Sequence, residues 1–232
     1  MKMVKLLSVC FAFFMLASCS NDEESTASEF KIVSSVLSTR APQLDESGAG
    51  KFVEGDENTV FFHTKAGKLL HSMNYVYGNR YLWENFGLPQ EVTACQVSAC
   101  YPTVTTNTPE SFEWNVVNEG ARADFLFAAP VEGNTLSSAP VVLAFSHALH
   151  ALKVELKATE ASVTEDMLAS AEITCRNFYP AARLNLLEGK SVGTAGELAA
   201  LKKTGKKAVF MVPAQTVGSM QVVVKIGSRE KV

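Results

Sequence analysis

Cysteine is too scarce in this sequence to build a disulfide framework. The 232 residues contain five cysteines, and two of these, Cys10 and Cys19, lie close to the amino terminus. The other three, Cys95, Cys100 and Cys175, are an odd number and form no complete set of pairs. Cys95 and Cys100 belong to one expected strand, where five steps of ~3.3 Å put them roughly 16 Å apart on opposite faces, beyond disulfide reach. No Cys/His spacing typical of zinc is present, so we expect no metal site.

Clustered positive charge and catalytic motifs are also missing. The formal net charge is −3, and Lys and Arg do not gather in any segment, which argues against nucleic acid as a partner. The sequence contains no nucleophile elbow, no glycine-rich phosphate loop and no HExxH motif. The carboxylates of Glu54, Asp56 and Glu57 lie in an expected turn and are expected to be solvated. We therefore predict that the protein is not an enzyme and needs no cofactor.

No apolar run is long enough to span a bilayer, which takes roughly 20 residues. The run from Leu6 to Ala17 follows two lysines and fits the hydrophobic region of a secretory signal. It ends in Leu-Ala-Ser-Cys at residues 16–19, which resembles the bacterial lipobox. The resemblance implies that residues 1–18 are a lipoprotein signal peptide and that Cys19 is the lipid attachment site. Several acyl chains anchor a protein firmly, at ~0.8 kcal/mol per buried methylene.

The segment after this cysteine, SNDEESTASE, is acidic and polar. It has nothing to bury, so residues 19–29 are expected to form a flexible tether. The same residues resemble the acidic signal that sends some Gram-negative lipoproteins to the outer face of the outer membrane. We expect a protein that is lipid-anchored in the outer membrane and exposed at the cell surface.

Short apolar or alternating runs recur along the rest of the chain, separated by clusters of Gly, Pro, Asn and Asp. Many short strands at fairly regular spacing are typical of an all-β sandwich or barrel. Residues 75–83 predict a hairpin with a tight turn at Gly78-Asn79. Helix signals are weak, and the strongest lie at residues 160–170 and 195–203. The expected strands are residues 29–37, 58–64, 75–83, 91–102, 111–117, 122–130, 140–149, 151–158, 170–178, 181–189, 207–213 and 220–227.

The segment AFSHALHALKVEL, residues 144–156, places two histidines three residues apart. Apolar residues up to Phe145 share one strand phase with His147, whereas those after the second histidine follow the opposite phase. A strand changes phase only through a bulge or a turn, so we expect a bend between His147 and Ala151. On a straight strand His147 and His150 face opposite ways, and no third ligand lies nearby in the sequence. The pattern therefore predicts a core histidine bonded to a backbone group rather than a metal site.

Several short motifs, taken in order, resemble the fimbrillin-like (Mfa-like) family of lipoproteins that build type V fimbriae. Each motif is short, and together with the lipobox the set covers residues 19–160. The resemblance implies that Phe145, His147 and Leu149 belong to a structural strand motif of the family. The motifs are Thr39-Arg40-Ala41, Gly55-Asp56 with Val60-Phe61, Asp124-Phe125-Leu126-Phe127-Ala128, and Phe145-x-His147-x-Leu149 with Leu152-Lys153-Val154.

The resemblance implies two transthyretin-like Greek-key β-sandwich domains. The N-terminal sandwich would comprise residues 30–160, and residues 161–232 would form a small C-terminal β domain. Members of the family usually continue with further C-terminal strands, whereas this sequence stops at GSREKV. Either the sequence is truncated and the second domain incomplete, or the subunit donates no terminal strand and lies at one end of a fibre.

The functional implication of the resemblance is assembly by strand exchange. In the family's stalk subunits a protease cuts after an arginine, the first strand leaves, and a strand from the next subunit replaces it. Here the first strand would be residues 30–37, and the cut would separate Arg40 from Ala41, unless Arg40 is only a loop residue before Pro42. We expect a structural subunit, anchor or accessory component of cell-surface fimbriae that mediates adhesion. Its partners would be other fimbrial subunits and the outer membrane.

A surface glycan-binding lipoprotein is the alternative function. Trp83, Trp114 and several tyrosines would then form a platform for sugar rings. Aromatic residues at strand positions more often pack in a core or across strands. Retention on polysaccharide gels that is lost when either tryptophan becomes alanine would favour the glycan-binding function over the fimbrial one.

Overall fold

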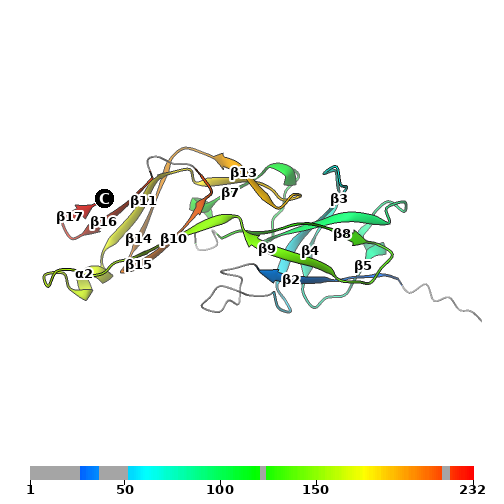
Figure 1. Cartoon of the computed structure of the whole chain (residues 1–232), viewed down its shortest axis with the longest axis horizontal. Helices are drawn as coiled ribbons and strands as arrows, with labels where there is room; N and C mark the ends of the chain where they lie inside the picture. The colour runs from blue at the N-terminus through cyan, green and yellow to red at the C-terminus, as the bar shows by residue number, and fades with distance from the viewer. Residues whose placement is uncertain (1–26, 37–51, 121–123, 216–219) are drawn as a thin grey trace, which may run out of the picture.

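β-Strands make up nearly all of the regular structure, and the strands lie in two regions along the long axis of the molecule (Figure 1). The all-β sandwich prediction is confirmed. No helix of the described part of the chain is long and apolar enough to cross a membrane. The computed structural model describes residues 27–36, 52–120, 124–215 and 220–232. Its short helices are η1 (Trp83–Phe86), η2 (Pro109–Ser111), α1 (Val116–Glu119) and α2 (Glu165–Ala169).

The N-terminal region is built on a six-stranded sheet with the order β2-β9-β8-β6-β3-β4. Its neighbours are antiparallel except for β2 and β9, which run parallel. A two-residue strand, β1 (Glu29–Phe30), precedes β2 and pairs with β5 (Tyr81–Leu82). The strands of the large sheet are β2 (Ile32–Val36), β3 (Glu57–His63), β4 (Leu69–Val76), β6 (Ala94–Tyr101), β8 (Leu126–Asn134) and β9 (Val141–His147).

One face of this sheet covers the first hydrophobic core. Side chains alternate along a strand, so Phe62 of β3 and Phe145 of β9 point to this face and are fully buried. Phe30 of β1 and Trp83 and Phe86 of η1 pack on Phe62. The first strand and a single 3₁₀ turn therefore complete this core.

The C-terminal region consists of three smaller sheets. One has the order β14-β11-β16-β17, another the order β13-β12-β7, and β10 pairs with β15. Because β7 and β10 precede residue 160 and pair with strands that follow it, the two regions interlock, and the expected domain boundary there stays a prediction. The strands are β7 (Phe112–Asn115), β10 (Leu149–Glu155), β11 (Glu172–Phe178), β12 (Ala181–Asn185), β13 (Lys190–Ala195), β14 (Ala199–Thr204), β15 (Lys207–Pro213), β16 (Gln221–Ile226) and β17 (Arg229–Lys231).

The second hydrophobic core is shared by the two regions. Phe61, Cys100 and Phe127 enter it from the other face of the six-stranded sheet, and Phe210 of β15 enters it from the C-terminal region. Cys95 lies on the same strand as Cys100 but in the first core. The prediction that these two cysteines face opposite ways is confirmed, and both are buried free thiols.

The strand that carries the two histidines passes from one region to the other. β9 ends at His147 within the six-stranded sheet, Ala148 lies in a bend, and β10 begins at Leu149 and pairs with β15. The bend predicted between His147 and Ala151 is confirmed. It accounts for the change of apolar phase, because the chain leaves one core and enters the other there.

Two local predictions require correction. Residues 195–203 form no helix: they hold the end of β13 and most of β14, whose pairing with β11 outweighs a weak helix propensity. Residues 75–83 do turn at Gly78, where φ is +95°, but β5 pairs with β1 and not with β4. The Tyr81 hydroxyl accepts the Val76 N–H instead, at 3.0 Å.

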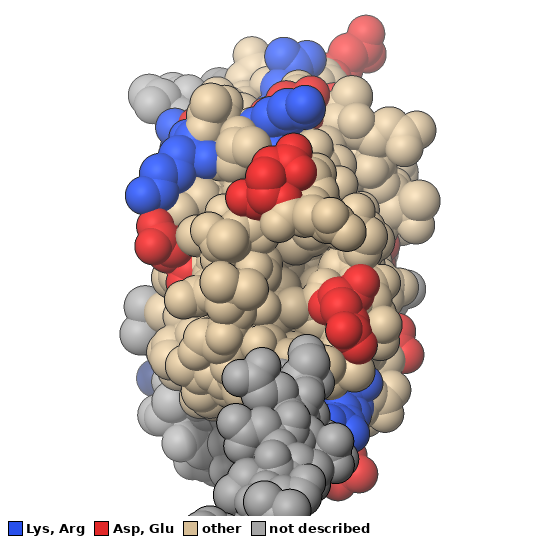
Figure 2. All heavy atoms as spheres, turned by 90° about the vertical axis from the view of Figure 1, so that its right-hand side faces the viewer, with Lys and Arg blue, Asp and Glu red and all other residues tan. Residues whose placement is uncertain are grey.

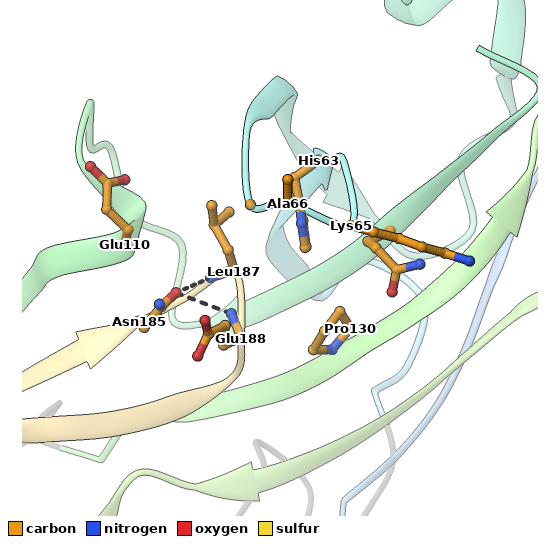
Figure 3. Close-up of a pocket in the computed structure, with 10 residues that line it drawn as sticks. His63, Lys65, Ala66, Glu110, Pro130, Asn185, Leu187 and Glu188 are labelled. Carbon is orange, nitrogen blue, oxygen red and sulfur yellow. Dashed lines mark hydrogen bonds between the residues drawn. The ribbon is translucent and has the colours of Figure 1, made fainter.

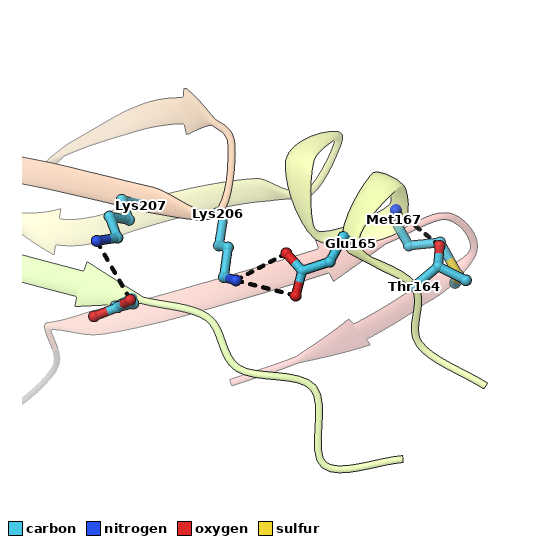
Figure 4. Close-up of polar contacts among 6 residues, drawn as sticks. Thr164, Glu165, Met167, Lys206 and Lys207 are labelled. Atoms are coloured by element: carbon cyan, nitrogen blue, oxygen red, sulfur yellow. Dashed lines mark hydrogen bonds and ion pairs between the residues drawn. The ribbon is translucent and has the colours of Figure 1, made fainter. Parts of the chain in front are cut away.

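The helix predicted within residues 160–170 is present as α2 (Figure 4). The Thr164 hydroxyl caps it by accepting the Met167 N–H at 3.3 Å. Lys206 donates to both carboxylate oxygens of Glu165, at 3.1 and 2.8 Å. This pair joins the first turn of α2 to the turn between β14 and β15.

The end of the molecule farthest from α2 carries no dominant charge. Figure 2 views this end and shows acidic and basic side chains scattered among uncharged ones over the part that grey atoms leave visible. The described residues in this view form no basic patch.

Candidate functional site: the first strand and the strand bend

One aromatic side chain, Phe30, anchors the first strand and is only 1% exposed. Its ring makes edge-to-face contacts with Phe62, Tyr75, Trp83 and Phe86, with ring centroids 4.7–5.7 Å away. Each such pair contributes about 0.5–1.5 kcal/mol beyond the burial of area. Phe30 therefore fills a site that β3, β4 and η1 build around it.

Backbone hydrogen bonds fix the chain after this anchor. The Ile32 N–H donates to the Tyr75 hydroxyl at 3.2 Å, and the Val141 N–H donates to the Lys31 carbonyl at 2.8 Å. Burial raises the pKa of Tyr75, so this hydroxyl keeps its proton at neutral pH. The first strand is thus bound both by a side chain of β4 and by the backbone of β9.

Hydrogen bonds also reach the last residues of the expected tether. The Trp83 N–H donates to the Ser28 carbonyl at 3.0 Å, and the Glu29 N–H donates to the Ser138 hydroxyl at 2.9 Å. Residues 28 and 29 therefore already belong to the folded part of the chain.

Among the described strands, β2 lies at the edge of its sheet and has one neighbour. It runs parallel to β9, with Ile32 opposite Val141 and Val36 opposite Phe145. Ile32 and Val36 point into the core, whereas Val33 is 46% exposed. The strand sequence IVSSV carries no charge, and charge is a common means of keeping other strands from an edge. No charged side chain of β2 therefore discourages another strand from pairing with the backbone on the side of β2 that faces away from β9.

Three of the predicted site residues lie outside the described part of the chain. These are the lipid-attachment residue Cys19 and the two residues of the expected cut, Arg40 and Ala41. The first strand, expected at residues 30–37, is present as β1 and β2 with a break at Lys31. Arg40 follows the end of β2 by four residues in the sequence.

The structural histidine at the bend pairs with a carboxylate. His147 Nδ1 lies 2.9 Å from Oδ1 of Asp124, and the same oxygen accepts the Phe125 N–H at 3.0 Å. The prediction of a backbone partner is therefore wrong. Asp124 reaches the bend because β8 pairs with β9, which places Leu126 opposite His147.

The residues on either side of this histidine divide between the two cores. Phe145 is fully buried in the first core, and Leu149 is 4% exposed in the second. His150 is exposed. The described residues hold no group of three His, Cys, Asp or Glu side chains that could bind a metal. The motif thus connects two cores at the crossing strand.

Neither tryptophan offers a platform for sugar rings. Trp83 is 4% exposed and packs on Phe30, and Trp114 is 6% exposed and packs on Phe125 at 4.9 Å. Both side chains are core residues. A glycan site built on them is therefore excluded.

Sequence reasoning missed a close contact between the two regions at Gly189. This residue lies between β12 and β13 with φ of +59°, and a Cβ there would be 2.7 Å from both the Cα and the N of Ala129. The sequence predicted a strand through this position, at residues 181–189, whereas β12 ends at Asn185 and a turn follows. The close approach of Gly189 to β8 involves residues sixty positions earlier in the chain, so no pattern in the local sequence indicates it.

The fold and the strand arrangement define an all-β sandwich protein. More specifically, the chain belongs to the fimbrillin-like family, whose model matches residues 39–232. No curated protein matches the sequence.

Solved structures from Bacteroides share the fold. A candidate cell adhesion protein of Bacteroides uniformis is 18% identical with a TM-score of 0.62, and the match covers 88% of this chain and 80% of that one. A second, of Bacteroides ovatus, is 14% identical with a TM-score of 0.60 and coverage of 88% and 84%. A third, of Bacteroides thetaiotaomicron, is 13% identical with a TM-score of 0.55 and coverage of 88% and 84%. At these identities the likeness is one of fold alone.

Proposed function

We propose that this protein is a structural subunit, anchor or accessory component of cell-surface fimbriae that assembles by β-strand exchange and mediates adhesion. Membership of the fimbrillin-like family supports the fimbrial or adhesin role. The observation that carries the exchange mechanism is the arrangement of the first strand. Its core side chains are almost fully buried, yet within the described part of the chain β2 pairs with β9 alone.

The first strand has the properties of a replaceable insert. Without it, β9 would expose the backbone groups that now pair with β2, and the aromatic residues around Phe30 would lose their central ring. An exposed edge is a template for another chain. Strand addition supplies main-chain hydrogen bonds for affinity and side-chain pockets for specificity. A strand from a second subunit that carries a large apolar residue at the position of Phe30 would restore both.

Proteolysis after Arg40 is the proposed trigger. The cut would fall four residues beyond Val36 and would separate the first strand from the rest of the chain. It would also separate the folded region from a lipid on Cys19. A subunit that is cut enters the fibre, whereas one that stays uncut remains a membrane anchor.

Limited digestion with an arginine-specific protease tests this mechanism. The cleaved protein should form a ladder on SDS gels that resists detergent but collapses on boiling. Arg40→Ala should abolish the ladder, and the matched change Arg80→Ala, at an exposed arginine elsewhere, should not. Cleaved protein that has lost the first strand and stays monomeric contradicts strand exchange.

Lipid attachment at Cys19 is the second part of the proposal. Labelled palmitate should enter the full chain in a bacterial host and should disappear in Cys19→Ala. Cys10→Ala, a change within the expected signal peptide, should leave the label in place. Label that persists in Cys19→Ala contradicts the anchor and an outer-membrane location that depends on it.

A scaffold rather than a catalytic role completes the proposal. The family is fimbrial and the neighbours of similar fold are candidate adhesion proteins, which supports a structural function. Partners are then other fimbrial subunits and the outer membrane, and neither a cofactor nor nucleic acid is needed.

A further inference from the structure

A cavity of about 530 Å³ lies where the N-terminal sheet meets the turn between β12 and β13 (Figure 3). Its walls come from the β3–β4 turn at Lys65–Gly67, Gln96 of β6, Pro130 of β8 and Glu188 of the β12–β13 turn. The volume falls in the ~300–1,000 Å³ range of small-molecule sites. Segments far apart in sequence therefore converge on one hollow at the junction of the two regions.

Strand register places a row of polar side chains beside this cavity. His63 of β3 lies opposite Gln96 of β6, and Gln96 lies opposite Glu132 of β8. β8 carries an extra residue between its pairings with Val97 and Ala99, which forms a bulge that includes Pro130. At the bulge and the polar row, polar side chains replace the apolar side chains on this face of the sheet.

The opposite wall is held rigidly. The Asn185 side-chain oxygen accepts the N–H groups of Leu187 and Glu188, both at 3.1 Å (Figure 3). Gly189 then packs directly on the backbone of Ala129. The backbone of the β12–β13 turn is thus held against β8 at this wall.

His63 supplies an unpaired hydrogen-bond acceptor at this wall. Its side chain is 3% exposed, and its ring points toward the middle of the lining residues in Figure 3. Nδ1 lies 3.0 Å from the carbonyl of Thr64, so Nδ1 carries the proton and Nε2 is an acceptor. Nε2 is buried, and no described residue donates a hydrogen bond to it. Burial lowers the pKa of His63, so the ring is neutral at pH 7.

The remaining polar groups are mixed and nearly balanced in charge. Lys65 pairs with Glu132 at 2.9 Å, and Glu188 pairs with Lys190. Glu110, at the rim, makes no ion pair with any described residue. Gln96 offers both a donor and an acceptor. The described residues that line the cavity include no Phe, Tyr or Trp, so recognition there depends on hydrogen bonds.

We propose that this junction cavity binds a neutral polyhydroxylated ligand, namely a single sugar residue or the end of a short saccharide. Each hydroxyl group both donates and accepts, which matches an acceptor at His63, an amide at Gln96 and carboxylates at Glu110 and Glu188. The balance of the two ion pairs disfavours a strongly charged ligand. The inference gives the proposed adhesive role a ligand class, but binding itself requires no strand exchange.

Ligand-observed NMR on the uncut Cys19→Ala chain tests the inference. The probes are the methyl glycosides of glucose, galactose, mannose and N-acetylglucosamine, with butylamine as a cationic comparison. We expect saturation transfer to at least one glycoside, and at least a five-fold weaker affinity in Gln96→Leu. Ala66→Trp, at the exposed rim, should abolish binding by filling the entrance, whereas Ser228→Trp, in the exposed β16–β17 turn, should not.

Three outcomes overturn the inference. One is the absence of transfer to all four glycosides, another is glycoside binding that survives Ala66→Trp, and the third is binding of butylamine alone. The uncut chain keeps its first strand, so none of these results bears on whether the protein assembles by strand exchange. Conversely, a cleaved protein that stays monomeric leaves this binding test unchanged.

Discussion

The two hydrophobic cores of this molecule are completed in different ways. The first is completed by Phe30, which stands on a short strand with few pairing partners. The second is interlocked: β3, β6 and β8 contribute Phe61, Cys100 and Phe127 to it, and later strands contribute the rest. The first core therefore depends on a short strand at one end of the described chain, whereas the second is built by strands from both regions.

The edge strands of the two regions also differ in their charge. β2 carries no charged residue, whereas β14 carries Lys202 and Lys203, and β17 consists of Arg229, Glu230 and Lys231. Charged edge strands discourage pairing with other chains. The comparison teaches that the N-terminal edge suits strand pairing and that the C-terminal edges resist it.

The largest expected effect is the loss of the anchor of the first core. Phe30→Ala should lower the free energy of unfolding by about 3–5 kcal/mol, as is typical of a buried Phe→Ala change. Val33→Ala, on the exposed side of the neighbouring strand, should change it by less than about 0.5 kcal/mol. Urea denaturation followed by tryptophan fluorescence measures both. If both substitutions lowered the free energy of unfolding equally, Phe30 would not be the residue that completes the first core.

A second prediction concerns the close contact between the two regions at Gly189. Gly189→Ala should cost roughly 2–4 kcal/mol, because it adds a clash with the Ala129 backbone to the strain of a positive φ. Gly67→Ala has a φ of +81° but meets nothing within 4 Å, so it should cost only about 1–2 kcal/mol. Thermal unfolding of the two variants separates steric clash from backbone strain. Identical losses would show that the close approach does not matter.

A third prediction concerns the pH dependence of the N-terminal sheet. Burial lowers the pKa of His63 and of His71, so the unfolded chain takes up protons first as the pH falls below about 6.5. Stability should therefore fall between pH 7 and pH 5, by at most ~1.4 kcal/mol per pH unit for each histidine. His63→Gln should flatten this slope, and His150→Gln, at an exposed position, should not. Stability that rises toward pH 5 contradicts the burial argument.

The smallest effect should come from the ion pair beside α2. The Glu165 side chain is 72% exposed, so Glu165→Gln should cost no more than about 0.5–1 kcal/mol. Thr164→Ala removes the helix cap and should cost about 1 kcal/mol. Thermal melts at low and high salt distinguish them, because only the ion pair is screened. If the loss of stability in Thr164→Ala depended on salt, Thr164 would not act as a simple hydrogen-bonding cap.

Local patterns in the sequence predicted local features of the structure. The change of apolar phase around His147 predicted the bend, and alternation predicted that Cys95 and Cys100 face opposite cores. A first strand near residue 30 was also predictable, because its apolar run is bounded by polar segments.

Features that depend on distant pairings were not predictable. The rings around Phe30 come from residues 32 to 56 positions later, and no periodicity connects them. Asp124 reaches His147 only through the pairing of β8 with β9. Residues 195–203 carry a helical pattern, yet β11 recruits most of them as a strand. The junction cavity requires several such pairings at once.

The most direct test of the central claim is complementation of a chain that begins at residue 38 with a synthetic peptide of residues 27–37. If the first strand is a replaceable insert, the two should bind one to one when refolded together, and the melting temperature should rise with peptide concentration. A peptide with Phe30→Ala should fail to bind, and one with Val33→Ala should bind normally. A shortened chain that ignores the peptide and melts at the temperature of the intact protein would contradict the account.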